Sequence, residues 1–371
     1  MRIYTAIGLM SGTSMDGIDA AVLETDGRDH LHRGPSISIA YDAGMRARIK
    51  RAAEAFRGTT DRDGRPGISA DVEEEITIAH ASAIESLCRR AGLARGQIDI
   101  VGFHGQTVFH RAEIGLTIQL GNGPLLARSC GIDVVYDLRA DDMRAGGQGA
   151  PLVPAYHVAL ARTLDLPRPL AFVNIGGVAN VTWVPPDGEP VAFDTGPGNA
   201  LIDDWCAAKI GVPIDRDGAL AARGRIDEAA LARLSAHRYF RLGYPKSLDR
   251  GDFSTAEVAA LSPEDGAATL AAFTAATIAG AARLCPAPPQ AWVVCGGGRR
   301  NPAIMDGLRA RVSGDLFTCE DVGLRGDDIE AEAFAYLAVR SLEGLPLTFP
   351  GTTGVAAPTV GGRLCRYDQA A

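Results

Sequence analysis

A short segment near the N-terminus, Gly12 to Asp19, places glycines, hydroxyls and carboxylates between two apolar runs. Glycine lets the backbone approach a ligand closely, and N–H groups and small hydroxyls can then bind a phosphate. Asp16 and Asp19 add carboxylates that could hold Mg²⁺ directly or through its waters. Both flanking runs have strand character, so the segment predicts a β-hairpin whose turn binds phosphate. An ordinary turn is the alternative, because Gly, Ser and Asp are common in turns.

Two further glycine turns follow apolar strand-like runs. The first, Asn174 to Asn180, contains Gly176 and Gly177 and again has the order strand, turn, strand. The second follows residues 291–295 and has three glycines in succession with a nearby asparagine: Gly296, Gly297, Gly298 and Asn301. We interpret them as a second phosphate turn and as a place where backbone approaches a nucleotide. Without a ligand, the first pattern is explained by a turn and a strand that packs closely through glycine, and the second by a flexible turn between a strand and a helix.

Polar side chains also stand at the ends of predicted strands. Asp194 ends a short strand over 191–194 and precedes a glycine and a helix over 200–209. Catalytic groups of open α/β sheets collect at such ends, although a helix-capping aspartate is the more common case. His104 and Arg139 follow two other strands and could bind a hydroxylated, anionic ligand, Arg being suited to a carboxylate, although single His and Arg residues are more often structural.

The elements that must position these groups alternate between strands and helices, which predicts an α/β protein. Each half opens with a glycine hairpin, so we expect a duplicated plan of two lobes, each a mixed sheet flanked by helices. We place the N-terminal lobe at 1–135 and the C-terminal lobe at 136–344, with the tail 345–371 returning to the first. Three helices are distinctive: 71–91, capped by Asp71 and Glu74, a buried alanine-rich helix over 267–284, and 327–342.

The composition is that of a soluble globular chain. Of 371 residues, 46% are hydrophobic and 22% charged, and the net charge of −8 gives no support to nucleic-acid or anionic-membrane binding. The seven cysteines include no C-x-x-C pair, which favours reduced thiols. The N-terminus runs directly into a strand and the apolar stretches are interrupted, so we expect no signal peptide or membrane span and a cytoplasmic location.

Taken together, the motifs resemble the sugar-kinase, heat-shock-chaperone and actin superfamily, and within it the anhydro-N-acetylmuramic acid kinase family. The resemblance extends over nearly the whole chain. Its most specific segments are Met10 to Asp19, Phe103 to Thr107, Gly146 to Leu152, Asn174 to Asn180, Phe193 to Asn199 and Glu330 to Ala335. The family usually has Lys-Ser-Thr-Gly-Arg-Glu where this chain has Lys246 to Gly251, which leaves the contacts of that loop open.

The resemblance implies an enzyme that uses ATP and Mg²⁺ to open the anhydro bridge of 1,6-anhydro-N-acetylmuramic acid and phosphorylate O6. Asp194 would be the base that activates water, and His104, Arg139 and Glu330 would contact the sugar. The first turn would bind phosphates and Mg²⁺ through Gly12, Thr13, Ser14, Met15, Asp16, Gly17, Ile18 and Asp19. Gly176 and Gly177 would form the second phosphate turn, and Gly296 to Asn301 the adenosine turn. A homodimer is also implied.

Two alternatives stay open at this point. One is a kinase of the same fold that acts on a different sugar or acid. The other is a nucleotide-driven clamp of the actin or chaperone kind, because one fold hosts many functions. A clamp would hydrolyse ATP slowly with or without sugar, and it would not depend on Asp194.

Overall fold

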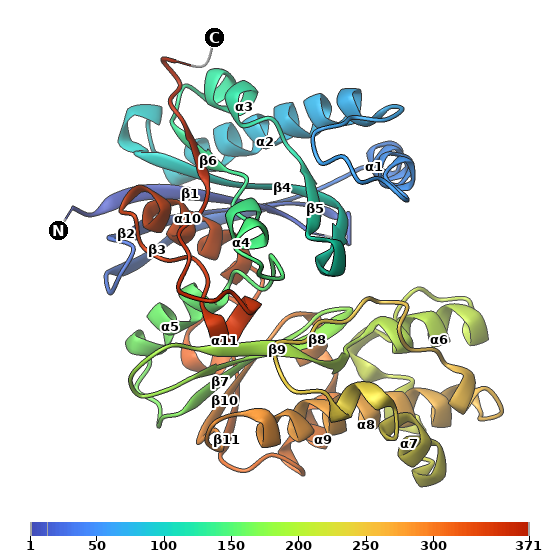
Figure 1. The fold of residues 1–371 in the computed structure, drawn as a ribbon. Helices are drawn as coiled ribbons and strands as arrows, with labels where there is room; N and C mark the ends of the chain where they lie inside the picture. Colours follow the sequence, from blue (N-terminus) through green and yellow to red (C-terminus); the bar gives the residue numbers. More distant parts are fainter. Residues whose placement is uncertain (1, 13, 370–371) are drawn as a thin grey trace. The chain divides into compact units, whose positions relative to one another are not determined.

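The computed structural model describes residues 2–12 and 14–369, which divide into two compact units. Unit 1 contains the chain up to Thr163 and again from Asp328, and unit 2 contains Leu164–Asp327. Each unit is built on one mixed sheet with helices on both faces (Figure 1). The α/β class predicted from the alternating elements is therefore confirmed.

The sheet of unit 1 begins with an antiparallel meander and continues with parallel strands. Its order is β12 (Arg363–Cys365), β6 (Val134–Tyr136), β4 (Ile100–Arg111), β1 (Tyr4–Ser11), β2 (Gly17–Thr25) and β3 (Leu31–Ala40), with β5 (Leu116–Leu120) beside β4. Strands β4 and β6 run parallel to β1, whereas β2 and β3 alternate in direction. The carboxyl ends of β1, β4 and β6 thus lie at one edge, where ligand sites of α/β sheets collect.

Helices cover both faces of this sheet. On one face α2 (Ser69–Ala91) and α3 (Gly123–Cys130) share an apolar core with alternate residues of β1 and β4, such as Leu9 and Phe103. On the other face lies α10 (Ile329–Leu342), with α5 (Pro154–Thr163) beside it. The remaining helices of unit 1 are α1 (Ala43–Ala55), α4 (Ala140–Arg144) and α11 (Pro350–Thr353).

Two glycines let α10 lie directly on the central strands. A Cβ on Gly8 of β1 would stand 1.8 Å from the carbonyl oxygen of Ala331, and one on Gly102 of β4 would stand 2.0 Å from that of Phe334. Neither distance is possible for real atoms, so both positions require glycine at this helix–sheet spacing. This contact holds α10 in unit 1, although α10 follows the whole of unit 2 in the chain.

The sheet of unit 2 repeats the same plan. Its order is β11 (Asp315–Thr318), β10 (Ala291–Cys295), β7 (Leu170–Ile175), β8 (Val178–Val184) and β9 (Val191–Pro197). Here β7–β8–β9 is the antiparallel meander and β10 runs parallel to β7, as β4 does to β1. The helices are α6 (Ala200–Ile210), α7 (Glu228–Ser235), α8 (Pro263–Ala281) and α9 (Pro302–Arg309). The duplicated plan predicted from the two hairpins is confirmed.

The observed units differ from the predicted division at 135/136 and 344/345. The segment 136–163 stays in unit 1 because β6 pairs with β4 and α5 packs beside α10. The helix 329–342 returns to unit 1 because it covers the β1–β4 face. The tail also belongs there, since β12 pairs with β6.

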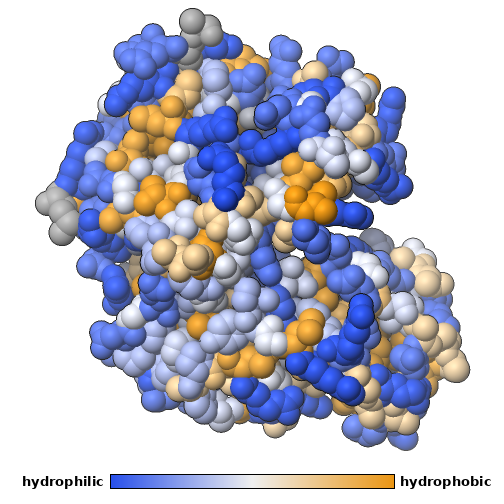
Figure 2. All heavy atoms as spheres, in the orientation of Figure 1, coloured by the Kyte–Doolittle hydropathy of each residue, from blue (hydrophilic) through white to orange (hydrophobic). Residues whose placement is uncertain are grey.

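The alanine-rich helix is a core element of unit 2. In the described chain, Pro263–Leu284 is long and apolar enough to cross a membrane by length and composition, but 67% of that apolar stretch is buried. Phe273 and Ile278 of α8 pack among the residues of one large core cluster. Figure 2 shows hydrophilic residues spread over the visible surface of each unit, with apolar residues in separate patches.

Candidate functional site

The first glycine turn of unit 1 joins β1 to β2 as predicted. The two strands pair in antiparallel register up to Met10 opposite Asp19. Within the turn, the N–H of Met15 donates to the carbonyl of Gly12 at 3.1 Å, and Met15 has a φ of 54°. Thr13 was predicted to belong to this turn and lies outside the described residues. The hairpin prediction is confirmed, and its phosphate role stays a prediction.

A buried glutamine of β4 fixes the position of this turn. Gln106 is fully buried, and its Nε2 donates to the carbonyl of Gly12 at 2.7 Å. Its Oε1 lies 2.7 Å from Ser11 Oγ, which also lies 3.0 Å from the hydroxyl of Tyr41. The carbonyl of Asp16 accepts from the N–H of Tyr41 at 2.8 Å. Both ends of the turn are therefore tied to neighbouring elements.

Carboxylates of the turn are coupled to Glu330 at the start of α10. Burial raises the pKa of Glu330, nearby Arg139 opposes the shift, and Asp19 and Asp16 add to it. Asp16 itself accepts from Ser14 Oγ at 2.7 Å. The fold thus brings together the predicted metal and sugar residues Asp16, Asp19, Arg139 and Glu330, which come from three separate segments of the chain.

The described residues contain no group of three or more His, Cys, Asp and Glu side chains that would bind a metal ion alone. Mg²⁺ usually keeps several waters and is held by one or two carboxylates together with substrate phosphates. Two aspartates beside a glycine turn are the donor set of such a site. Asp16 and Asp19 therefore fit Mg²⁺ that arrives with a phosphate ligand, and the metal role stays a prediction.

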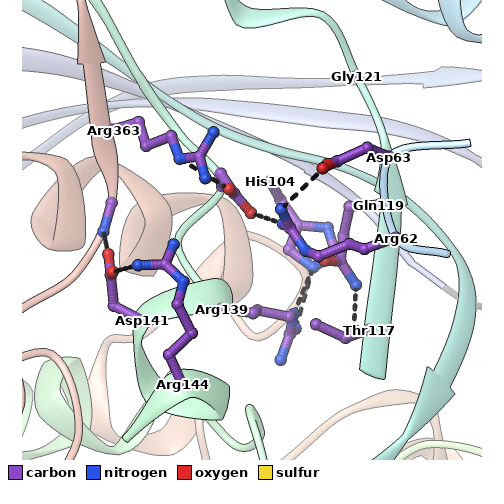
Figure 3. A network of polar contacts seen from close by, with 12 residues as sticks. Arg62, Asp63, His104, Thr117, Gln119, Gly121, Arg139, Asp141, Arg144 and Arg363 are labelled. Carbon is purple, nitrogen blue, oxygen red and sulfur yellow. Dashed lines mark hydrogen bonds and ion pairs between the residues drawn. The ribbon is translucent and has the colours of Figure 1, made fainter. Parts of the chain in front are cut away.

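His104 and Arg139 form a buried pair in unit 1. The Nε and one Nη of Arg139 lie 3.1 and 3.0 Å from His104 Nε2, and its other Nη donates to the carbonyl of Gly149 at 2.7 Å. His104 Nδ1 lies 2.7 Å from the carbonyl of Gly105. Burial and the Arg139 charge hold the pKa of His104 well below its usual value, so the imidazole is neutral. Figure 3 shows Arg139 pointing at His104.

In unit 2 the second glycine turn packs against the start of α6. The carbonyl of Gly176 accepts from the N–H of Asn199 at 2.7 Å, and that of Gly177 accepts from the N–H of Gly198 at 2.9 Å. A Cβ on Gly177 would stand 3.9 Å from an Nη of Arg250, whose other Nη donates to Asp204 at 2.7 Å. The predicted turn is present, with a guanidinium beside it that the sequence reasoning left unassigned.

The third glycine turn is built against the second. Gly296 has a φ of 73°, and a Cβ there would meet the carbonyl of Ile175 at 2.7 Å. A Cβ on Gly298 would meet Ile175 Cγ2 at 2.2 Å. Asn301 is buried and caps α9, because its Oδ1 accepts from the N–H of Ala303 at 3.0 Å. Close packing and capping account for these residues in part, and their nucleotide contacts stay predictions.

Asp194 lies within β9, which continues three residues beyond the predicted strand end. Its Oδ2 accepts from the N–H of Leu248 at 2.8 Å. Its backbone N–H donates to the carbonyl of Lys246 at 3.1 Å, and its carbonyl accepts from Tyr239 Oη at 2.6 Å. Burial raises the pKa of Asp194 to about 7, while the Leu248 N–H and the Lys246 charge oppose this shift. Such a carboxyl can accept a proton near neutral pH.

The loop after Asp194 supplies residues whose roles the sequence did not indicate. Lys246 is 8% exposed, with its ammonium 4.3 Å from the Tyr239 ring. Leu248 contacts Asp194 through its backbone, so its departure from the usual Thr leaves that hydrogen bond intact. In the sequence, only the family resemblance of this loop indicated that its residues have a role. That resemblance does not distinguish backbone contacts from side-chain contacts.

Two sheets of one topology, each opening with a glycine hairpin, define a protein of the actin-like, sugar-kinase class. Within that class, the family model for anhydro-N-acetylmuramic acid kinase matches residues 4–366. The chain belongs to this family.

Relatives of the same description cover nearly all of the chain. An anhydro-N-acetylmuramic acid kinase of Rhizobium etli is 52% identical over 98% of this chain and 98% of its own length. An anhydro-N-acetylmuramic acid kinase of Rhodospirillum rubrum is 55% identical over 96% of this chain and 93% of its own length. Among solved structures, (R)-2-hydroxyglutaryl-CoA dehydratase component A of Acidaminococcus fermentans matches 92% of this chain and 100% of its own with a TM-score of 0.49 and 14% identity, too little to support a conclusion.

Proposed function

We propose that this protein uses ATP and Mg²⁺ to convert 1,6-anhydro-N-acetylmuramic acid and water into N-acetylmuramic acid 6-phosphate and ADP. Membership of the family and relatives of that name at about half identity support this substrate. The reaction would serve the recycling of cell-wall sugars. A cytoplasmic homodimer is part of the same proposal, and neither nucleic acid nor membrane is proposed as a partner.

The observation that carries the proposal is the environment of Asp194. In the proposed reaction water attacks C1, Asp194 accepts a proton from that water, and the bond from C1 to the bridging oxygen breaks. The released O6 then attacks the γ-phosphorus of ATP, and ADP leaves. A carboxyl with a pKa of about 7, held by the Leu248 N–H, is suited to accept this proton.

The other predicted residues supply binding in this proposal. The turn from Gly12 to Asp19 and the turn at Gly176 and Gly177 would bind the ATP phosphates, with Mg²⁺ on Asp16 and Asp19. Gly296, Gly297, Gly298 and Asn301 would bind adenosine. His104, Arg139 and Glu330 would contact the sugar. Positioning and charge stabilisation are the main requirements of phosphoryl transfer.

The test is turnover of the anhydro sugar in ¹⁸O-water, followed by mass spectrometry. We expect label at C1 of the product, and a loss of at least 10³-fold in kcat for Asp194→Asn. Asp165→Asn, an exposed carboxylate of unit 2, serves as the matched control and should keep wild-type kcat. Phosphorylation of open sugars alone would overturn ring opening. Sugar-independent ATP hydrolysis that Asp194→Asn leaves unchanged would favour a nucleotide clamp.

A further inference from the structure

Unit 1 contains a cavity of about 120 Å³ beside the middle of β4 and the carboxyl end of β6. Its walls come from His104 and Gly105, from Tyr136 and Asp137, from the loop before α2, and from β12. For scale, a water molecule in the liquid occupies about 30 Å³, so the space suits a small organic group. Every lining residue belongs to unit 1.

The cavity is lined by guanidinium groups that converge on one buried carboxylate. Asp137 has a φ of 57°, its side chain is 9% exposed, and it pairs with Arg62 and with Arg363, the latter at 3.2 Å. Figure 3 shows Arg62 and Arg363 reaching toward the same space from opposite sides. Arg62 contacts Asp137 through one Nη, and Arg363 contacts it through Nε.

The remaining N–H donors of these two arginines have no close acceptor among the described residues. Arg62 Nε is buried without a hydrogen-bond partner, and Arg62 Nη1 reaches only Asp63, at 3.9 Å, whose side chain is 93% exposed. Arg363 contacts Asp137 through Nε, and among the described residues its Nη groups form no hydrogen bond or ion pair. Because Arg62 Nε has almost no accessible surface, the donors open to a ligand in the cavity are Arg62 Nη1 and the Nη groups of Arg363, whose side chain is 51% exposed.

The other charged groups at the cavity do not compete for such a ligand. Arg65 is committed to a bidentate pair with Glu73, both contacts at 2.9 Å, and to two backbone carbonyls of its own loop. His104 is neutral. Asp137 offsets one of the two remaining arginines, and solvent screens the exposed Asp63. The cavity therefore keeps an excess of about one positive charge, which a monoanion would neutralise.

Arg139 does not offer the same chemistry in this structure. The edge of its guanidinium formed by Nε and one Nη faces His104 Nε2, and the other Nη is bonded to Gly149. A carboxylate binds best to a free pair of parallel N–H groups. Arg363 keeps its two Nη groups for such a pair, because it contacts Asp137 through Nε.

We propose that this cavity binds the carboxylate of a small ligand, with Arg62 and Arg363 as its two guanidinium donors. Two sources have this chemistry: the acid arm of a muramic sugar, which rests on the proposed function, and a free short hydroxy acid, which does not. His104 forms a wall of the cavity and also contacts Arg139, so it would link the carboxylate to the predicted sugar contacts.

Binding is tested with D-lactate as the probe, by NMR titration of the full chain. We expect saturable binding that weakens at least tenfold in Arg363→Met and in Arg62→Met. Arg366→Met, near the end of the same strand with an exposed ion pair to Asp133, is the matched control and should bind as wild type. The Arg363 side chain is 51% exposed, so its replacement should fold, and Arg363→Lys keeps the charge without the planar pair.

The source is tested by steady-state kinetics with the anhydro sugar and its analogue lacking the lactyl group. A rise in KM of at least tenfold for the lactyl sugar alone in Arg363→Met assigns the cavity to the acid arm. Unchanged KM with Arg363-dependent lactate binding assigns it to a free acid. If neither lactate binding nor KM responds to Arg363→Met, the cavity proposal is overturned while the proposed function stands. If no anhydro sugar is phosphorylated, the function fails, and lactate binding alone decides the cavity.

Discussion

At the scale of single residues, the pKa of Asp194 results from two opposing influences. Burial makes its charged form costly, while the N–H of Leu248 and the charge of Lys246 favour that form. The net result is a pKa of about 7 for the carboxyl, far above its ordinary value of 3.8. A base must be ionised before it accepts a proton, yet a strongly acidic group accepts one poorly. A pKa near the working pH meets both requirements.

This environment predicts the pH dependence of the proposed reaction. Since the carboxylate form is active and the pKa is raised, kcat/KM should rise with pH, with a midpoint near pH 7. Two pH units below the midpoint, about 1% of the group is ionised, so the rate should fall about 100-fold. A kcat/KM profile from pH 5 to 8, checked for reversible inactivation, measures this. A flat profile would contradict the assignment of Asp194 as the base.

Lys246 should act through Asp194, as a positioning residue. Removing its charge in Lys246→Met should raise the pKa of Asp194, because that charge now lowers it. The midpoint of the kcat/KM profile should then move to higher pH, and Lys246→Arg should restore it in part. Lys209→Met removes a lysine that packs on Trp205 of the same unit and is the control. A lower kcat with an unmoved midpoint would indicate a purely structural role.

At the scale of elements, the position of α10 depends on the absence of two side chains. Gly8 and Gly102 lie side by side on neighbouring strands, and both face the backbone of α10. Read in sequence, they are only two interruptions in apolar strand runs. In the structure they allow α10 to pack closely on the sheet, and α10 in turn places Glu330 near Arg139 and the first turn.

The substitution Gly102→Ala should therefore disturb both stability and substrate binding. Its Cβ would stand 2.0 Å from a backbone oxygen of α10, so helix and sheet must separate. We expect a loss of about 1–3 kcal/mol in the free energy of unfolding, measured by urea denaturation, and a raised KM for the sugar. Gly96→Ala is the control, because nothing lies within 4 Å of a Cβ there. Equal stability of both variants would refute the close contact.

Element positions were largely predictable, and their ends less so. The helix predicted over 71–91 begins at Ser69, and no side-chain cap is formed at its start, so the proposed Asp71–Glu74 capping box is wrong. The strand around Asp194 continues to Pro197 because it stays paired with β8. In both cases packing and pairing with neighbours override a local signal, which is why ends are harder to predict than elements.

At the scale of the whole molecule, unit 2 is one continuous segment inserted between the two parts of unit 1. It has its own apolar core, which includes Trp205, Trp292 and Phe273. Unit 1 needs both of its parts, because α10 and β12 lie after the insertion. The division thus follows contacts between distant segments, whereas the predicted boundaries followed the order of motifs.

This division predicts how fragments behave. The fragment 164–327 should fold alone and melt cooperatively, followed by circular dichroism. The fragment 1–163 should not, because without α10 the glycine-bearing face of its sheet is exposed. Adding a segment 328–371 to it in trans should restore protection of β1 amides from hydrogen exchange. Cooperative folding of 1–163 alone would contradict the dependence on α10.

Local pattern in the chain was sufficient for the strands, the helices, both hairpin turns and the duplicated order, because hydrophobic period and glycine placement act over a few residues. It also identified the candidates Asp194, His104, Arg139 and Glu330 through the family they resemble. It did not predict that α10 and Glu330 belong to unit 1. It also did not predict that Gln106 contacts the first turn, that Leu248 and Lys246 contact Asp194, or that the pKa of Asp194 is raised. Those depend on burial and on contacts between segments far apart in the chain, which exist only once the sheets and helices have packed.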